Sequence, residues 1–156
     1  MDLKSKIRRI PEFKGVVFWD ITPLLKDKDA FRECIKLMAD HFRRKNIDVV
    51  VSSEARGFIL GGALAYELEA GFVPIRKKGK LPSKKVSLTY KKEYESDTIE
   101  IHEDAIRPGE RVVIIDRGRI VGGIRNFRFN QSILQMLASV EQLGPAVRAA
   151  GEEAFE

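Results

Sequence analysis

The amino-acid sequence predicts an α/β protein in which a parallel sheet is flanked by helices. The short apolar run at positions 47–51 has the composition of a fully buried strand, and the runs at 71–75 and 112–115, the latter of β-branched residues, predict two more strands. Segment 58–68, between the first two runs, has the length and small-residue content of a helix, and its Gly61 and Gly62 are expected to permit close helix–sheet packing. Strands that alternate with helices favour right-handed βαβ units and a doubly wound sheet.

The N-terminal part is expected to hold a short helix, a strand and a longer helix. Residues 3–10 place apolar side chains on one helical face, and Pro11 would end that helix. Residues 15–19, GVVFW, predict a strand. Asp27 or Asp29 would cap the longer helix, whose core-facing residues recur at helical spacing: Phe31, Ile35, Met38 and Phe42.

The C-terminal half is expected to begin with a pair of exposed strands at 86–94 and 98–101. Glu100 belongs to the polar face of the second strand, because TIEIH alternates with a period of two. The next strand, VVIID, ends in an acid, and the Gly122-Gly123 pair that follows is expected to open a helix. Apolar residues at helical spacing continue through residues 131–143.

Composition and charge narrow the class of ligand. The chain of 156 residues carries a net charge of +5, concentrated around residues 76–92, and no aromatic residue interleaves the basic loop 76–85. A small phosphorylated ligand is therefore expected rather than a nucleic acid, with a basic surface that has no partner as the alternative. No apolar run approaches the roughly 18 residues of a membrane span, so a cytoplasmic protein without a membrane partner is expected. The single cysteine, Cys34, is expected to be a buried apolar residue of a helix.

Three predicted strand ends carry residues that could bind a phosphate ester with Mg²⁺. The turn Ser53–Gly57 follows one strand, the cations of Arg76–Lys80 follow the next, and Asp116 ends the third. The carboxyl ends of parallel strands meet at one edge of a sheet, where ligands bind in α/β proteins. Arginine at the end of a strand has a purely structural role in about half of cases. For Arg56 a structural role is therefore the alternative to phosphate binding.

Ordered matches along the chain resemble the adenine phosphoribosyltransferase family. They include FxDITPLLKD at 18–27, EARGF at 54–58, RKxGKLP at 76–82, YxxEY at 90–94 and IHxDA at 101–105. The resemblance implies the type I phosphoribosyltransferase fold, with a small N-terminal hood and a flexible β lid, in one domain over residues 1–156. It also implies that the C-terminal strands of the family are truncated at Glu156.

The resemblance implies purine salvage, in which adenine and phosphoribosyl pyrophosphate give AMP and pyrophosphate with Mg²⁺ carried by the substrate, without direct protein ligands. It also implies a homodimer. Glu93 would be the catalytic carboxylate, Tyr90 and Tyr94 would belong to the lid, and Val17 and Phe18 would wall the base pocket. Asp116, Gly122 and Gly123 would bind the phosphoribosyl group. The pyrophosphate would meet Ser53, Glu54, Ala55, Arg56, Gly57, Arg76, Lys77 and Lys80.

The phosphoribosyl loop departs from the family pattern at three positions. Arg117 replaces a second acid, and Val121 and Ile124 replace two hydroxyl residues. Each hydroxyl lost from a phosphate site costs about 1–3 kcal/mol of binding energy. Impaired activity is therefore one expectation. The alternatives are an inactive relative that binds a nucleotide or phosphate as a regulator or partner, and a damaged sequence with the fold alone.

Overall fold

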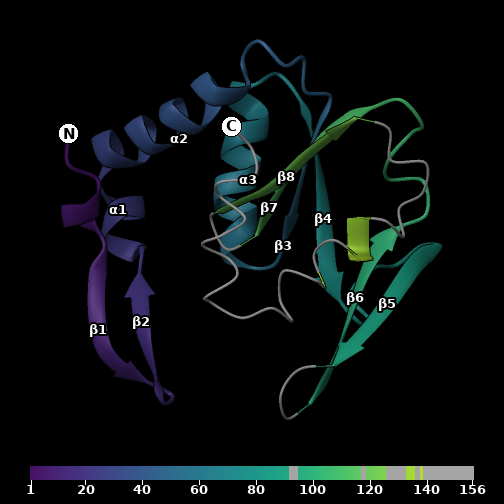
Figure 1. The fold of residues 1–156 in the computed structure, drawn as a ribbon, viewed down its shortest axis with the longest axis horizontal. Helices are drawn as coiled ribbons and strands as arrows, with labels where there is room; N and C mark the ends of the chain where they lie inside the picture. The colour runs from purple at the N-terminus through teal and green to yellow at the C-terminus, as the bar shows by residue number, and fades with distance from the viewer. Residues whose placement is uncertain (92–94, 117–118, 126–132, 136–137, 139–156) are drawn as a thin grey trace. The chain divides into compact units, whose positions relative to one another are not determined.

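The computed structural model describes residues 1–91, 95–116, 119–125, 133–135 and 138, and of 119–125 the backbone. The chain divides into two compact units, residues 1–44 and 45–156 (Figure 1). A single domain over the whole chain stays a prediction. Among the described residues, no helix is long and apolar enough to cross a membrane.

The first unit contains a hairpin where the sequence favoured a helix. A 3-10 turn at Lys4–Lys6 leads into β1 (Arg8–Phe13), which pairs antiparallel with β2 (Val16–Asp20). The turn between the strands is formed by Lys14 and Gly15, both at positive φ, as the tight turns of hairpins require. The expected helix ending at Pro11 is wrong. Proline fits this two-stranded sheet because the pairing register shifts around it, between Ile10 and Phe13.

The long N-terminal helix is confirmed. After α1 (Thr22–Lys26), α2 spans Lys28–Phe42 and buries one face, including Ile35 and Phe42. Asp27 is its N-cap: the carboxylate accepts hydrogen bonds from the backbone N–H groups of Asp29 and Ala30, at 3.1 Å each. The same carboxylate lies 2.7 Å from Lys6 Nζ, which joins the start of the chain to the start of α2.

The second unit is built on a six-stranded sheet with the order β5-β6-β4-β3-β7-β8. Its three adjacent central strands are parallel, as the apolar runs predicted. The outer pairings are antiparallel, so the sheet as a whole is mixed. The strand bounds are β3 (Val49–Ser53), β4 (Gly71–Lys77), β5 (Lys85–Lys91), β6 (Ser96–His102), β7 (Arg111–Asp116) and β8 (Arg119–Arg125).

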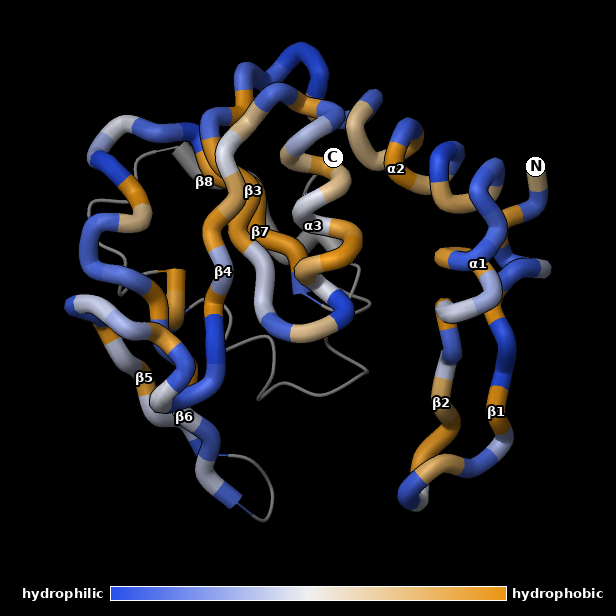
Figure 2. Tube along the Cα trace, turned by 180° about the vertical axis from the view of Figure 1, so that it is seen from behind, coloured by the Kyte–Doolittle hydropathy of each residue, from blue (hydrophilic) through white to orange (hydrophobic). Residues whose placement is uncertain are grey.

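The core of the second unit lies around β3 and β7, the apolar centre visible in Figure 2. Helix α3 (Arg56–Glu67) packs against β3, β4 and β7. A Cβ on Gly61 would lie 2.9 Å from Ser52 Cβ and 3.0 Å from Phe72 Cε2, so the prediction of close helix–sheet packing is confirmed there. It is wrong for Gly62, whose missing Cβ would face open space.

The Gly122-Gly123 pair lies in a strand and not at a helix start. β8 pairs antiparallel with β7, with Gly122 opposite Ile114 and Gly123 opposite Val113. Ile120, Val121 and Ile124 are β-branched and favour a strand, and their pairing satisfies the backbone groups of the open β7 edge. The predicted helix 131–143 lies largely outside the described residues. Its described part, at 133–135 and 138, is helical.

Candidate functional site

The parallel register brings the predicted strand-end residues to one edge of the sheet. Ser53 pairs with Ile75 in β4, and the preceding Ser52 pairs with Ile115 in β7. The Ser53 hydroxyl donates a 2.7 Å hydrogen bond to the carboxylate of Asp116, which is buried. This contact joins the turn after β3 to the end of β7, and it holds a carboxylate at the edge where a phosphoribosyl group was expected.

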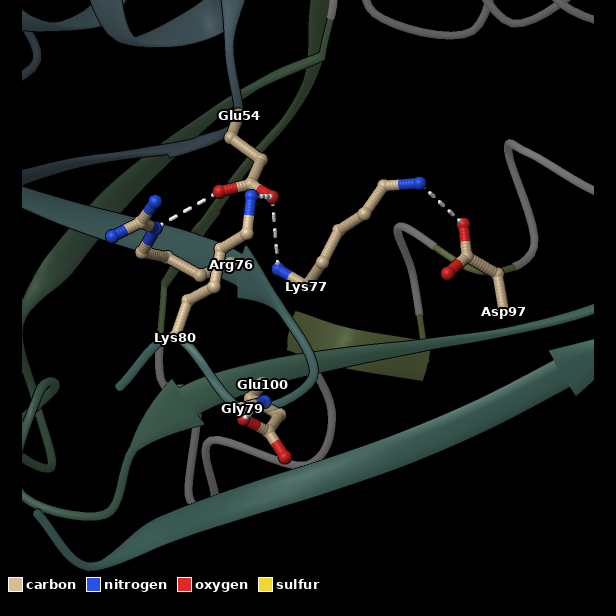
Figure 3. A network of polar contacts seen from close by, with 7 residues as sticks. All are labelled: Glu54, Arg76, Lys77, Gly79, Lys80, Asp97 and Glu100. Atoms are coloured by element: carbon tan, nitrogen blue, oxygen red, sulfur yellow. Dashed lines mark hydrogen bonds and ion pairs between the residues drawn. The ribbon is translucent and has the colours of Figure 1, made fainter. Parts of the chain in front are cut away.

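Glu54 is the centre of a charge cluster at the same edge (Figure 3). Its carboxylate accepts hydrogen bonds from Arg76 Nε at 2.9 Å, Lys80 Nζ at 3.0 Å and the Lys77 backbone N–H at 3.3 Å. Burial of this carboxylate is the largest single influence on the pKa of Glu54, and it raises the pKa because it disfavours the ionised form. The hydrogen bonds from Arg76, Lys80 and Lys77 together outweigh it, and they hold the pKa of Glu54 below its usual value.

The first part of the basic loop, residues Arg76–Lys80, is also held by β6. Lys77 Nζ lies 3.2 Å from Asp97 Oδ2, and the Gly79 backbone N–H donates to Glu100 Oε2 at 3.0 Å (Figure 3). Sequence reasoning missed both acids and placed Glu100 on an exposed face, yet its side chain is almost fully buried. The alternation of TIEIH is the same for a solvated and a buried polar face, so the sequence carried no signal that distinguished them.

The remaining residues that were predicted to bind pyrophosphate lie where β3 leads into α3. Glu54 and Ala55 are joined by a cis peptide bond, and Arg56 and Gly57 are the first two residues of α3. Gly57 lies against β3, because a Cβ there would be 2.2 Å from the Ser52 hydroxyl. A side chain at position 57 would therefore disturb the strand end that carries Ser53.

Other predicted site residues lie in the first unit, in the core of the second unit or outside the description. Val17 and Phe18 lie in β2 of the first unit. Tyr90 was expected in an exposed strand pair, but it is 5% exposed and packs in the core cluster with Ile99, so that expectation is wrong. Glu93, which has the predicted catalytic role, and Tyr94, which has a predicted lid role, lie outside the described residues. Arg117 also lies outside them.

No set of three or more His, Cys, Asp or Glu side chains that could hold a metal ion occurs within the described part of the chain. Glu54 is engaged by three donors and Asp116 by Ser53. Mg²⁺ takes one or two carboxylates together with phosphate oxygens and water. A magnesium ion carried by the diphosphate substrate stays a prediction.

Comparisons with known proteins agree with this geometry. A model of the phosphoribosyl transferase domain matches residues 20–117. The adenine phosphoribosyltransferase of Acidobacterium capsulatum is 55% identical over 123 residues, which cover 78% of this chain and 68% of that protein. The crystal structure of the same enzyme from Rhodothermus marinus has a TM-score of 0.68 and 51% identity, covering 73% of this chain and 66% of that one.

A third match carries ligands. The Saccharomyces cerevisiae enzyme, complexed with an imino-altritol bisphosphate and adenine, has a TM-score of 0.70 and 39% identity, over 74% of this chain and 69% of that one. The fold is thus that of the type I phosphoribosyltransferases. This chain belongs to the adenine phosphoribosyltransferase family.

Proposed function

We propose that this chain transfers the phosphoribosyl group of phosphoribosyl pyrophosphate to adenine, giving AMP and pyrophosphate. The observation that carries the proposal is the assembly of Ser53, Glu54, Asp116 and the basic loop at one sheet edge. Relatives that are named for this reaction support it. In the reaction, the bond between the ribose C1′ and adenine N9 forms, the C1′–oxygen bond to pyrophosphate breaks, and the N9 proton leaves.

The basic loop supplies the charge that such a displacement needs. Negative charge grows on the leaving pyrophosphate, and preplaced donors lower the barrier most when they face the place where the charge develops. Arg76, Lys77 and Lys80 supply three cations there. The turn Ser53–Gly57 supplies backbone N–H groups, and its Arg56 supplies a fourth cation. Mg²⁺ bound with the pyrophosphate would neutralise further charge on the leaving group.

The carboxylates and the base pocket complete the proposed roles. Asp116, oriented by Ser53, would accept hydrogen bonds from the ribose hydroxyls. Val17 and Phe18 would wall the adenine, Glu93 would take part in proton transfer at the purine, and Tyr90 and Tyr94 would belong to the lid. Gly122 and Gly123 would face the 5′-phosphate. Because both lie in β8, that assignment depends on the family resemblance alone.

An assay of AMP formation from adenine, phosphoribosyl pyrophosphate and Mg²⁺ tests the proposal. Arg76→Ala should lower kcat/KM about 100-fold, the cost typical of removing one donor to developing charge. Arg32→Ala, on the exposed side of α2, is the matched control and should leave kcat/KM within about two-fold, as surface substitutions generally do. A wild-type chain that forms no AMP above background would refute the proposed activity.

A second candidate is a relative that binds AMP or a phosphate ligand without turnover. Arg117 in place of an acid favours it, and so does the strand at Gly122-Gly123 where a glycine turn at a helix start was expected. Calorimetry that detects AMP binding by an inactive chain would support this candidate. Restoring the family residues with R117D, V121T and I124T should then raise turnover if the loop is the cause.

Two further parts of the proposal concern the whole protein. We expect a homodimer in the cytoplasm, as the family resemblance implies. Light scattering after size exclusion would then give twice the mass of one chain, and a mass of one chain would contradict the dimer. Fractionation of the source cells would test the location.

A further inference from the structure

The carboxylate of Glu100 is the most deeply buried acid among the described residues, at 2% exposure. Burial of a carboxylate is costly unless hydrogen bonds or a cation compensate for the lost water. Three groups do so here: the Gly79 backbone N–H at 3.0 Å, the Ser87 hydroxyl at 3.1 Å and, at 3.9 Å, Lys85 Nζ. Glu100 thus joins a strand of the sheet to two other segments, the basic loop and β5.

The Gly79 contact acts on the turn that places two cations. The Lys80 backbone N–H donates to the Lys77 carbonyl at 3.3 Å, which closes a four-residue turn with Gly79 at its third position. The φ of Gly79 is +82°, the left-handed value that this position of a type II turn requires. Glu100 therefore holds the N–H of the residue on which the turn depends.

The two lysines at the ends of this turn reach the acids already described. Lys77 lies against Asp97 of β6, and Lys80 lies against Glu54. The backbone N–H of Lys78 donates to the Thr98 carbonyl at 3.2 Å, a second anchor of the loop on β6. Lysine side chains are flexible, so their use as preplaced charges depends on a backbone that is held in one position.

We infer that Glu100 is a positioning residue for anion binding: through the Gly79 N–H it fixes the turn that presents Lys77 and Lys80 to pyrophosphate. The inference depends on the proposed function, because it assigns a role in binding the same leaving group. Glu100 itself does not touch the anion. Its loss should weaken the binding of pyrophosphate and phosphoribosyl pyrophosphate and should leave the binding of adenine unchanged.

Two substitutions of different severity test this inference in the full chain. Glu100→Met keeps the size of the side chain and removes both acceptor oxygens, whereas Glu100→Gln keeps one neutral acceptor. In calorimetry with inorganic pyrophosphate and Mg²⁺, Glu100→Met should raise Kd about ten-fold and Glu100→Gln about three-fold. The difference is expected because a hydrogen bond to a charged group is stronger than one to a neutral group. The same substitutions at the exposed Glu103, three residues along the chain, are the matched controls.

Two further readouts separate positioning from general loss of structure. In the ligand-free protein, amide exchange at Gly79 should be about ten-fold faster in Glu100→Met than in wild type, because its acceptor is gone. In turnover, KM for phosphoribosyl pyrophosphate should rise and KM for adenine should not. If neither Glu100 variant folds, Ser87→Ala removes one support of the carboxylate from an exposed position, and it should raise the pyrophosphate Kd about three-fold.

The possible failures are distinct. If wild type binds pyrophosphate and the Glu100 variants bind it as tightly as the Glu103 controls, this inference is wrong and the proposed function stands. Equal increases in both KM values would also overturn it, because they would show a general disturbance of the site. If wild type binds no pyrophosphate, both the inference and the proposed function fail.

Discussion

Substituting Gly57 by alanine should destabilise the protein through one identified contact. The new Cβ would lie 2.2 Å from the Ser52 hydroxyl, which must therefore move. That hydroxyl is buried and donates a 2.8 Å hydrogen bond to the Ile115 carbonyl of β7. Rotating Ser52 away breaks the bond inside the core, and leaving it in place overpacks the contact between α3 and β3.

The magnitude follows from two opposing effects. The lost hydrogen bond or the overpacking costs about 1–3 kcal/mol. Alanine is the better helix former by up to about 1 kcal/mol in a helix interior and offsets part of this. We therefore expect Gly57→Ala to lower the free energy of unfolding by about 1–2 kcal/mol, or Tm by about 2–8 °C for a chain of this size. Gly62→Ala in the same helix has open space around its Cβ and should raise Tm instead.

Urea denaturation of four proteins tests the contact: wild type, Gly57→Ala, Ser52→Ala and the double variant. When the Ser52 hydroxyl is absent, the nearest atom to the new Cβ is the Cβ at position 52, at an ordinary 3.5 Å. The double variant should therefore be about as stable as Ser52→Ala, with a coupling energy of about 1–2 kcal/mol. Additive effects within about 0.5 kcal/mol, or a stabilised Gly57→Ala, would refute the reasoning.

Three further predictions concern titratable groups. Because the pKa of Glu54 is lowered on folding, its ionised form adds stability at neutral pH, and this stability is lost as the pH falls through the carboxyl range. The free energy of unfolding of Glu54→Gln should therefore depend less on acid pH than that of wild type. An unchanged acid dependence would contradict this. Asp27→Asn should keep the cap of α2 and lose the ion pair with Lys6, whereas Asp27→Ala should lose both. Tm should therefore fall from wild type to Asp27→Asn and again to Asp27→Ala. Equal Tm values for the two variants would argue against the cap. Cys34 is only partly buried, not fully buried as the sequence predicted, and this burial raises its pKa; iodoacetamide should therefore alkylate it more slowly at pH 8 than in the urea-unfolded chain, and equal rates would contradict this.

Local patterns were sufficient for elements whose environment is uniform along their length. β3 and β7 each contain a continuous run of β-branched apolar residues, VVV and VVII, and such runs are stable only when both faces are buried, so their central parallel position followed from composition. Helix α2 combines an apolar face with the acceptor Asp27 directly before its first turn. The meeting of Ser53, Arg76 and Asp116 at one edge also followed, because the carboxyl ends of parallel strands coincide.

Where strand pairing or core packing decides the conformation of a segment, the local pattern was misleading. Pro11 suggested a helix end, but pairing with β2 placed it in a strand, and Gly122-Gly123 suggested a helix start, but the open edge of β7 recruited the segment as β8. Tyr90 lies in a strand with polar neighbours, yet it packs in the core beside Ile99.

The sequence by itself therefore determined the family, the central parallel strands and the edge at which the residues predicted to bind the anion collect. Only the tertiary structure decided that Asp97 and Glu100 hold the basic loop at that edge. Both acids lie in β6, and a periodic pattern cannot say whether such a group faces water or a donor from another segment. The difference comes from long-range contacts: the burial of Glu100 depends on Gly79 and Ser87, which the pairing of β6 with its neighbours brings to it.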